Sequence, residues 1–415
     1  MSENAEQRRW WIAQALALPA LLLLLVFAAH PFIYSAKVIA GFPYQLDREE
    51  GFLLHQAERL KEGQTIYPDL DEGYPYTVGN YTPLYPFIYA QVLRFTHTGL
   101  GPGRALVLAS TAGIALLMAF YVWAESKNYA AALAAPLLFL CTWDLNNWIP
   151  FARVDLPAIL FGIAGFVWAG RGREKIWIPA TAILFAAAFY TKQTQIFAPA
   201  AVFFWLLMQK RWRTAGIFAG ATGGLILVIG LFLLLLTSGQ FWQHTVTYNE
   251  NEFAWWQLWV WVKHLWFFNR WLLLGAFLAL GALVTKLSSS PSSSFFGDHT
   301  RLPILGIYFI LTLLSIIGIA KEGSAANYLL EFEVVAALLF CTVAGRIAPP
   351  FDRTKLILGV LFLLFLYGHA FRVFRLQQIL FLPPPSVENR MAGDHLLLMA
   401  DSAEGKVFSE DPIFP

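Results

Sequence analysis

The sequence predicts an all-α, polytopic membrane protein, and three observations lead to this fold class. Of its 415 residues, 58% are hydrophobic and only 13% are charged, whereas soluble domains carry about 25% charged residues. Several apolar runs approach the ~20 residues that a helix needs to cross a bilayer. The runs are continuous, which excludes the alternating pattern of a membrane β-barrel. We therefore expect about eleven transmembrane helices of ~20 residues each.

The first predicted span covers residues 11–34 and follows Arg8 and Arg9. A signal peptide would have a shorter apolar region followed by a small-residue cleavage site. We therefore interpret this run as a retained span with the N-terminus inside. Further spans are predicted at residues 104–124, 129–147, 152–169, 176–190, 195–209, 214–237, 269–285, 302–319, 329–345 and 355–371.

The predicted organisation is a transmembrane domain over residues 1–371, with a first outer loop over 35–103, and a short outer tail over 372–415. The segment at 81–95 is too short and proline-rich to span, so we expect it in the membrane interface. A segment rich in aromatic residues at 241–271 has two interpretations that can hold together. It is an interfacial belt helix, or a sugar-stacking wall over an active site.

The distribution of charge favours this orientation. Short cytoplasmic loops of membrane proteins carry an excess of Lys and Arg. The junctions that the topology places inside have such an excess, and the outer segments have an excess of Asp and Glu. Basic clusters flank residues 176–208 on both sides, so both ends of this segment are predicted to lie inside. The segment must then cross the membrane an even number of times, which predicts a helical hairpin. The overall net charge of +2 gives no indication of nucleic-acid binding.

The loop after the first span is rich in carboxylates. A carboxylate can remove the proton from an acceptor hydroxyl as that hydroxyl attacks the anomeric carbon of a sugar. Asp47, Glu49 and Glu50 are the candidate catalytic residues, because they cluster between Pro43 and Gly51, where an amphipathic helix is predicted to begin. The alternative is a solvated acidic loop. The acidic residues of the loop are Asp47, Glu49, Glu50, Glu58, Glu62, Asp69, Asp71 and Glu72.

Further polar side chains recur at the outer ends of the predicted spans. Lysine or arginine at such a place can hold the phosphate of a lipid carrier through charge-assisted hydrogen bonds. The simpler alternatives are lysines that extend to the interface and an Arg153 that only pairs with Asp155. Asp144, Asn146 and Asn147 close the third predicted span. The candidate substrate-binding residues are Arg153, Asp155, Lys192, Gln193, Asn249, Asn251, Lys321, Asn327 and Tyr328.

These groups lie at one predicted membrane face, while the middles of the spans are nearly free of ionisable residues. Transporters and pumps hold such residues near the bilayer midplane. One-sided placement favours an enzyme that works at the outer surface. A flippase or transporter of lipid-linked sugars, or a non-catalytic membrane protein of the same fold, stays open as an alternative.

Metal and thiol chemistry receive little support from the sequence. The eight histidines are scattered without ligand spacing, which argues against a metal held by histidine. No cofactor is certain, and a carboxylate-bound Mg²⁺ or Mn²⁺ stays open. Cys141 and Cys341 lie inside apolar runs, so we interpret them as small core residues.

The chain carries a series of loose motifs in a fixed order. They are Asp47-Arg-Glu-Glu-Gly51 with AERLKEGQTIY, then NYTPLYP, ARVDLPAIL, YTKQT, YNENEF and GSAANYLLE. Together they resemble the GT-C superfamily of polytopic membrane glycosyltransferases, whose relatives include protein mannosyltransferases and lipid A aminoarabinose transferases. The resemblance extends over residues 1–345.

The resemblance implies a GT-C fold in a prokaryotic plasma membrane, with the active site outside. It implies a hexosyl- or pentosyltransferase of the cell envelope. The sugar donor would be a polyprenyl phosphate embedded among the membrane lipids. The acceptor would be an extracytoplasmic glycan, lipid or protein. It also implies an acidic base in the first loop. Many relatives show an Asp-Glu pair where this chain has Glu49 and Glu50 after Asp47. Any of these three carboxylates can therefore be the base. Relatives often continue into a longer outer tail than residues 372–415.

Overall fold

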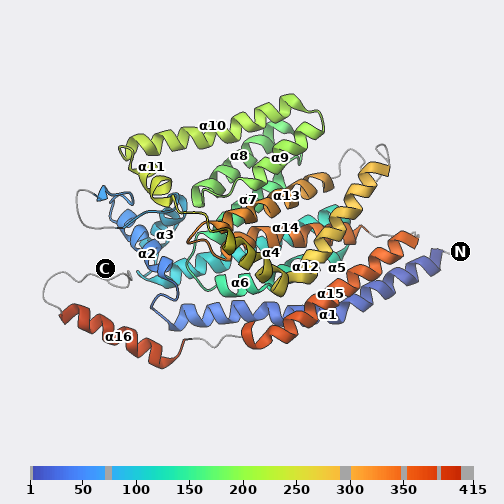
Figure 1. Ribbon diagram of the computed structural model, residues 1–415, viewed down its shortest axis with the longest axis horizontal. Coiled ribbons are helices and arrows are strands. Elements are labelled where there is room, and N and C mark those ends of the chain that lie inside the picture. The colour runs from blue at the N-terminus through green and yellow to red at the C-terminus, as the bar shows by residue number, and fades with distance from the viewer. Residues whose placement is uncertain (1–2, 71–76, 290–300, 347–352, 381–384, 403–415) are drawn as a thin grey trace.

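The protein is a bundle of helices, drawn as a ribbon in Figure 1. The computed structural model describes residues 3–70, 77–289, 301–346, 353–380 and 385–402. Within these ranges every named element is a helix, and an isolated antiparallel bridge joins Phe253 to Lys321. The elements are α1 (Glu3–Gly41), α2 (Arg48–Lys61), α3 (Leu84–Phe95), α4 (Leu100–Ser126), α5 (Tyr129–Leu140), α6 (Trp143–Trp148), α7 (Asp155–Trp168), α8 (Glu174–Thr191), α9 (Phe197–Met208), α10 (Trp212–Leu236), α11 (Gln240–Thr245), η2 (Thr247–Asn249), α12 (Trp255–Ser289), α13 (Leu302–Ser315), η4 (Ile316–Ala320), α14 (Asn327–Gly345), α15 (Arg353–Leu380) and α16 (Val387–Ser402).

The helices match the predicted spans in position. Seven helical stretches of the described chain are long and apolar enough to cross a membrane, and they lie in α1, α4, α10, α12, α13 with η4, α14 and α15. Three shorter apolar helices, α5, α7 and α9, and the hairpin partner α8 coincide with the remaining predicted spans. The all-α membrane fold is confirmed, whereas the number of eleven crossings stays a prediction.

Helix α14 lies at the centre of the bundle. From Leu329 onward its sequence is apolar on all sides apart from Glu331, Glu333 and Thr342, a pattern typical of a helix surrounded by protein. In the structure 83% of its apolar stretch is buried, against 6% for α10 at the edge of the bundle. Helix α14 packs against α4, α5, α12 and α13. Its first residue, Asn327, is therefore placed at the centre of one end of the bundle.

One predicted span is interrupted. The sequence predicts a continuous helix over 129–147, but α5 ends at Leu140 and the separate α6 begins at Trp143. The side-chain amide of Asn146 donates to the carbonyl oxygens of Leu140 at 3.2 Å and Thr142 at 2.8 Å. The first bond satisfies a carbonyl that the end of α5 leaves without a helical partner, and the second adds to the bond that the Thr142 carbonyl accepts from the backbone N–H of Asn146. Asn146 therefore stabilises the break.

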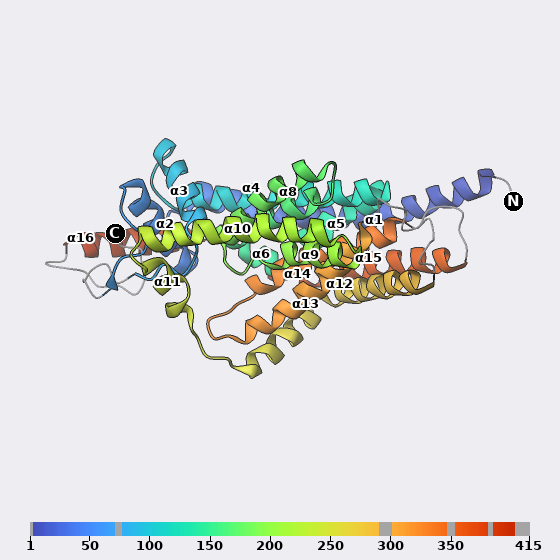
Figure 2. The ribbon, with the colours of Figure 1, turned by 90° about the horizontal axis from the view of Figure 1, so that it is seen from above.

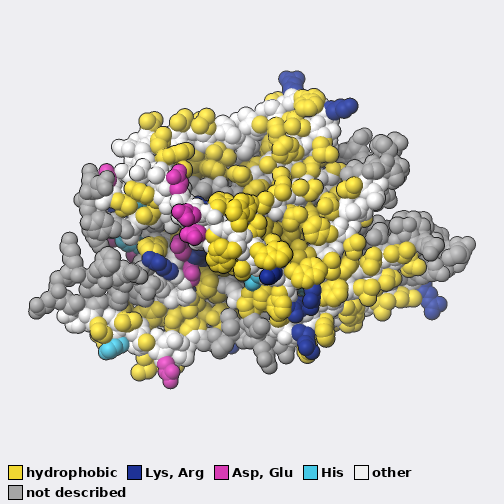
Figure 3. Space-filling model, in the orientation of Figure 1, with side chains coloured by type: hydrophobic (Ala, Val, Ile, Leu, Met, Phe, Trp, Pro, Cys, Tyr) yellow, Lys and Arg dark blue, Asp and Glu magenta, His cyan; other side chains and the backbone are white. Residues whose placement is uncertain are grey.

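Helix α12 begins well before the predicted span at 269–285 and bends at Asn269, whose φ of −120° and ψ of 18° are not helical. Figure 2 shows the half before the bend leaning away from the bundle. Trp255, Trp256 and Trp259 on this half are more than half exposed, and Figure 3 shows a broad hydrophobic surface there. The rings point outward, as the rings of an interfacial belt do.

The end of the bundle opposite the N-terminus carries α2, α3, α11 and α16 (Figure 1). Helices α2 and α3 pack together through buried Leu53, Ala57, Tyr85 and Tyr89. Helix α1 continues to Gly41, past residue 35 where the outer loop is predicted to begin, and buries Val38 in its last turns.

The tail contacts this same end of the protein. The hydroxyl of Tyr44, in the chain between α1 and α2, donates to Oδ1 of Asp394 on α16 at 2.5 Å. A side chain at Gly393 would collide with the Tyr44 ring, so the glycine permits the close approach. Asp71 and Glu72 of the predicted acidic loop, and residues 403–415 of the tail, lie outside the described residues.

The two ends of the bundle provide a matched test of orientation. Gln64, after α2, and Gln209, after α9, are both exposed, and the native cysteines are buried. We expect Gln64→Cys to react with a membrane-impermeant thiol reagent added to intact cells, and Gln209→Cys to react only after the membrane is opened. Labelling of Gln209→Cys in intact cells, with protection of Gln64→Cys, would reverse the predicted orientation.

Candidate functional site

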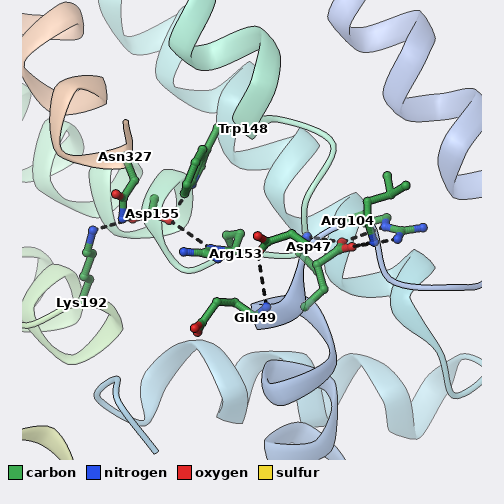
Figure 4. A network of polar contacts seen from close by, with 11 residues as sticks. Asp47, Glu49, Arg104, Trp148, Arg153, Asp155, Lys192 and Asn327 are labelled. Carbon is green, nitrogen blue, oxygen red and sulfur yellow. Dashed lines mark hydrogen bonds and ion pairs between the residues drawn. The ribbon is translucent and has the colours of Figure 1, made fainter. Parts of the chain in front are cut away.

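Asp47 stands at the start of α2 and caps that helix. Its backbone is extended (φ −141°, ψ 138°), and its Oδ2 accepts the backbone N–H of Glu49 at 3.3 Å, as an N-cap residue does. The same oxygen pairs with Nη1 of Arg153. The side chain is 27% exposed, and among the described residues no donor bonds to Oδ1. Asp47 therefore keeps one carboxylate oxygen open (Figure 4).

Glu50 is in the opposite situation, because it is fully buried and both of its oxygens are occupied. Oε1 accepts Nε of Arg104 at 2.9 Å and the backbone N–H of Ala152 at 2.7 Å. Oε2 accepts Nη2 of Arg104 at 2.9 Å and the backbone N–H of Leu46 at 2.7 Å. Glu50 thus joins the start of α2 to the start of α4 and to the chain that leads into α7.

Arg104 completes this junction, and sequence reasoning missed it. Its Nη1 donates to the carbonyl of Phe42 and its Nη2 to that of Tyr44, both at 2.7 Å. The side chain is fully buried. One signal could have identified it: an arginine at the head of an apolar helix requires a partner, because an unpaired buried charge is costly.

Glu49 lines a cavity of about 360 Å³ beside α2. Other walls of the cavity include Arg48, Asn80 and Tyr81. Burial raises the pKa of Glu49 above its ordinary value, the charge of Arg153 opposes this, and the Asp47 carboxylate adds to it. Glu49 is therefore a second carboxyl group that faces open space near Asp47.

Arg153 links Asp47 to a second carboxylate, Asp155. Its Nε lies 3.8 Å from Oδ2 of Asp155, and its guanidinium lies over the ring of Trp148 at 4.9 Å. Within the described chain its Nε is buried without a hydrogen-bond partner, and Nη1 is the nitrogen that bonds to Asp47. An arginine has five N–H donors, so Arg153 has donors left for a ligand.

Asp155, the first residue of α7, gathers the ends of three other helices. Its Oδ1 accepts Nζ of Lys192 at 2.5 Å and Nδ2 of Asn327 at 2.9 Å. Its Oδ2 accepts Nε1 of Trp148 at 2.8 Å. These partners come from the ends of α8, α14 and α6 (Figure 4). With Arg153 and Asp47, the network holds two cations and two carboxylates.

The chain between α8 and α9, the tip of the predicted hairpin, reaches this network through Lys192. Nζ of Lys192 lies 5.0 Å from the centre of the Tyr328 ring, an arrangement that stabilises a cation. The side-chain amide of Gln193 donates to the carbonyl of Asn80 at 2.9 Å. Since Asn80 lines the cavity beside Glu49, the hairpin tip supports one wall of that cavity.

Asn249, Asn251 and Lys321 are grouped in a neighbouring part of the same end. Nδ2 of Asn249 donates to the carbonyl of Asn80 at 3.0 Å. Lys321 donates through Nζ to the backbone carbonyl of Asn249, and Asn251 donates to the carbonyl of Glu322 at 3.0 Å. Asn249 thus supports the cavity wall, whereas Asn251 and Lys321 join the chain before α12 to the chain after η4.

A second buried network surrounds the bend of α12. Nε2 of His264 and Oδ1 of Asp144 are 2.7 Å apart. Nδ2 of Asn269 lies 3.3 Å from Oδ2 of Asp144 and 2.5 Å from Oε1 of Glu333. The non-helical backbone at Asn269 is therefore held between α6 and α14 by its own side chain. Sequence reasoning identified Asp144 but not its partners, which lie more than one hundred residues further along the chain.

The described residues contain no group of three or more His, Cys, Asp or Glu side chains arranged to hold a metal ion. The carboxylate oxygens of Asp155 accept hydrogen bonds from the Lys192 ammonium, the Asn327 amide and the Trp148 indole N–H, so protein donors already occupy them. The site as it stands is therefore built from ion pairs and hydrogen bonds between side chains.

Half of the sequence matches a known protein family. Residues 82–291 match the profile of glycosyltransferase family 87, and this stretch is half of the chain and includes Arg104, Arg153, Asp155 and Lys192. The chain belongs to glycosyltransferase family 87. No curated protein matches this family 87 chain.

Solved structures show which fold this family 87 member has. It resembles ArnT from Cupriavidus metallidurans bound to undecaprenyl phosphate, with a TM-score of 0.55 and 13% identity over 80% of this chain and 62% of that one. It also resembles the oligosaccharyltransferase of Archaeoglobus fulgidus tethered to an acceptor peptide, with a TM-score of 0.51 and 11% identity over 93% of this chain and 57% of that one. The family 87 chain spans about three fifths of the length of these proteins. The likeness confirms the predicted GT-C fold.

The buried pair of this family 87 chain yields a stability prediction. Arg104→Met leaves the Glu50 carboxylate buried without its cation, which typically costs about 3–5 kcal/mol. We expect the double variant Glu50→Leu/Arg104→Met to recover part of this loss, because no charge is then left unpaired, while the backbone groups that Glu50 and Arg104 bind still lose their partners. The measurement is unfolding of each purified variant in lipid nanodiscs.

Arg211 and Glu174 provide the control, because they form an ion pair at 2.6 Å that is 36% and 49% exposed. Exposed pairs contribute about 0–1 kcal/mol, so Arg211→Met should change stability little. An Arg104→Met protein as stable as Arg211→Met would show that the buried pair does not hold this end together.

Proposed function

We propose that this protein is a membrane glycosyltransferase that moves a sugar from a polyprenyl-phosphate carrier to an extracytoplasmic acceptor. The observation that carries the proposal is the pairing of Asp47 with Arg153. A partly exposed carboxylate with an open oxygen stands next to a guanidinium with unused donors. One group can take a proton from an acceptor hydroxyl, while the other can hold the phosphate of a donor.

Asp47 is the proposed general base. In the proposed reaction the acceptor oxygen bonds to the anomeric carbon, its proton passes to Oδ1 of Asp47, and the sugar–phosphate bond breaks with its electrons on the phosphate. The leaving group is then already a stable anion, so no strong acid is required. Glu50 is a weaker candidate because four donors occupy its oxygens. Glu49 is a candidate because it faces the cavity. It ranks second because its raised pKa favours the neutral form, which cannot accept a proton.

Arg153 is the proposed phosphate ligand. The sequence suggests Lys192 and Lys321 for this role, but both ammonium groups are already engaged, one by Asp155 and one by a backbone carbonyl. The guanidinium fork of arginine matches phosphate in a bidentate geometry. Nε of Arg153 is buried and faces Asp155 at 3.8 Å, and Nη1 bonds to Asp47. Nη2 makes no hydrogen bond to the described residues and is not among the buried atoms, so it is the donor that a phosphate can reach.

The other predicted substrate-binding residues are proposed as positioning residues. Asp155, with Lys192 and Asn327, fixes the far side of Arg153. Gln193 and Asn249 hold the Asn80 carbonyl at the cavity wall, and Tyr328 covers Lys192. Asn251 and Lys321 act at longer range, through the loop that carries Asn249. The Glu50–Arg104 pair holds the segments on which Asp47 and Arg153 lie.

The similar structures support a lipid-phosphate donor. The structure of ArnT contains undecaprenyl phosphate, and that of the oligosaccharyltransferase has an acceptor peptide attached. The acceptor of this chain is proposed only as a glycan, lipid or protein outside the cytoplasm. Lipid mass spectrometry of host cells that lack the chain tests the function as a whole. We expect a sugar–phosphate lipid to accumulate and its product to be under-glycosylated; unchanged lipids and products would refute the proposal.

The proposed base yields a direct prediction. Asp47→Asn keeps the shape and the helix cap but cannot accept a proton, so turnover should fall by roughly 10²–10⁴-fold while donor binding survives. Glu49→Gln should have a smaller effect. The measurement is transfer of radiolabelled sugar from its polyprenyl-phosphate donor by purified variants. Asp69→Asn, in the same acidic loop, is the matched control and should remain active.

Two results would reassign the base. An Asp47→Asn protein with more than about a tenth of the wild-type rate, together with an inactive Glu49→Gln protein, would transfer the role to Glu49, given the expected size of general-base catalysis. Activity in all three variants would mean that the acidic loop is only a solvated surface.

The proposed phosphate ligand is tested separately. Arg153→Lys keeps the charge but loses the fork, and loss of a charged hydrogen bond costs about 1.5–3 kcal/mol, roughly ten- to hundred-fold in apparent donor affinity. Lys321→Ala should change this affinity little, since Lys321 serves a backbone carbonyl. Lys192→Ala is unsuitable as a test, because it removes the nearer of the two cations beside the buried Asp155. Equal donor affinity in Arg153→Lys and wild type, with reduced affinity in Lys321→Ala, would reverse the assignment.

A further inference from the structure

We propose that Arg270, Arg372 and Arg375 form a binding site for the headgroup of an anionic bilayer phospholipid, whose acyl chain lies in an aromatic hollow on α12. The site is on the outer surface of the bundle, where α12 and α15 pack together. It is separate from the network of Asp47, Arg153 and Asp155, and it uses none of the residues proposed for sugar transfer.

The three arginines form a cluster of like charge. Arg372 and Arg375 are three residues apart on α15 and therefore lie on the same face of that helix. Arg270 lies on α12, and the charges of Arg270 and Arg375 both act on Arg372. No ion pair joins any of the three to a carboxylate among the described residues. Nε of Arg372 is buried and has no hydrogen-bond partner in that part of the chain.

The packing of the two helices holds this cluster together. Trp271 on α12 lies against Gly368 on α15, where a Cβ would come within 2.6 Å of the indole. Nη2 of Arg372 donates to the backbone carbonyl of Phe267, and its guanidinium lies 4.3 Å from the centre of the Phe267 ring. Arg372 is thus held in place between the charges of Arg270 and Arg375. An anion between them would relieve their repulsion.

The hollow lies directly beside the arginines. It has a volume of about 560 Å³ and is lined on α12 by Trp259, Lys263, Trp266, Phe267 and their neighbours. Phe267 belongs to both features, because it lines the hollow and stacks under Arg372. Figure 3 shows Lys and Arg side chains gathered beside the hydrophobic surface of α12 and α15. An apolar hollow joined to an unpaired cationic cluster matches an amphiphile with a phosphate headgroup and a hydrocarbon chain.

Snorkelling alone does not account for the arrangement. A lone arginine near a helix end extends into the interface at little cost, but three adjacent arginines repel one another unless an anion is present. Anionic lipids supply phosphate groups at a bilayer surface, and each Lys or Arg near such a surface strengthens binding by about five-fold. Charge complementarity therefore favours an anionic phospholipid as the occupant.

The test is a titration of the purified full-length protein with phosphatidylglycerol and with phosphatidylcholine, followed by native mass spectrometry. We expect the wild-type protein to prefer phosphatidylglycerol, and Arg270→Gln/Arg372→Gln/Arg375→Gln to lose this preference by roughly 100-fold. The triple lysine variant should keep part of it, because it retains charge without the fork. Arg94→Gln on α3, an exposed arginine, is the matched control and should bind like the wild type.

A single substitution separates loss of lipid binding from misfolding of the triple variant. Arg375 is exposed, so Arg375→Gln should fold normally and lower the preference by about five-fold. A wild-type protein without preference, or an unchanged preference in Arg375→Gln and the triple glutamine variant, would overturn the proposal. Competition for the bound phosphatidylglycerol by undecaprenyl phosphate would also overturn it, because the arginines would then belong to the site of the sugar donor.

Discussion

The buried ion pair between Glu50 and Arg104 fixes the two segments on which the candidate chemistry depends. Glu50 lies three residues after Asp47 in the first turn of α2, and it accepts the backbone N–H of Ala152, the residue before Arg153. One carboxylate therefore aligns the start of α2 with the chain that enters α7. Arg104 adds the carbonyls of Phe42 and Tyr44, so the exit from α1 is held at the same point. Breaking such a pair leaves a buried charge, which is far more costly than losing an exposed pair.

The polar groups of the site all lie at helix ends, where the backbone itself needs partners. Asp47 caps α2, Asp155 opens α7, Lys192 follows α8 and Asn327 opens α14. A membrane helix satisfies its own backbone in its middle, so polar side chains placed there would gain nothing, whereas at the ends they complete the structure. The result is a network at one end of an otherwise apolar bundle. This placement differs from the midplane sites of transporters and agrees with the proposed transfer at a membrane surface.

The sequence predicts the helices of this protein well, because apolar runs of membrane length leave few other structures open. It also locates Asp47 before a helix, since a short acid followed by Glu49 and Glu50 is a local capping signal. It does not reveal that Glu50 is bound by Arg104, 54 residues away, or that Lys192 meets Asp155 across two helices. Those pairings depend on how the ends of α4, α7 and α8 meet, which no local pattern encodes. The break before α6 was missed for a similar reason. In the sequence Asn146 indicates only the end of a span, whereas in the structure its amide donates to two carbonyls at the break.

Helix α6 shows how the two buried networks depend on each other. It has six residues, and so short a helix is not stable alone, because nucleation costs more than its few hydrogen bonds return. Its first turn is held by Asp144, which contacts His264 and Asn269 at the bend of α12, and its last residue, Trp148, donates to Asp155. The position of Trp148, and with it the ring beneath Arg153, is therefore set partly by the bend in α12. The residues around the proposed phosphate ligand thus take part of their geometry from the buried contacts of Asp144 with His264 and Asn269 at the bend of α12.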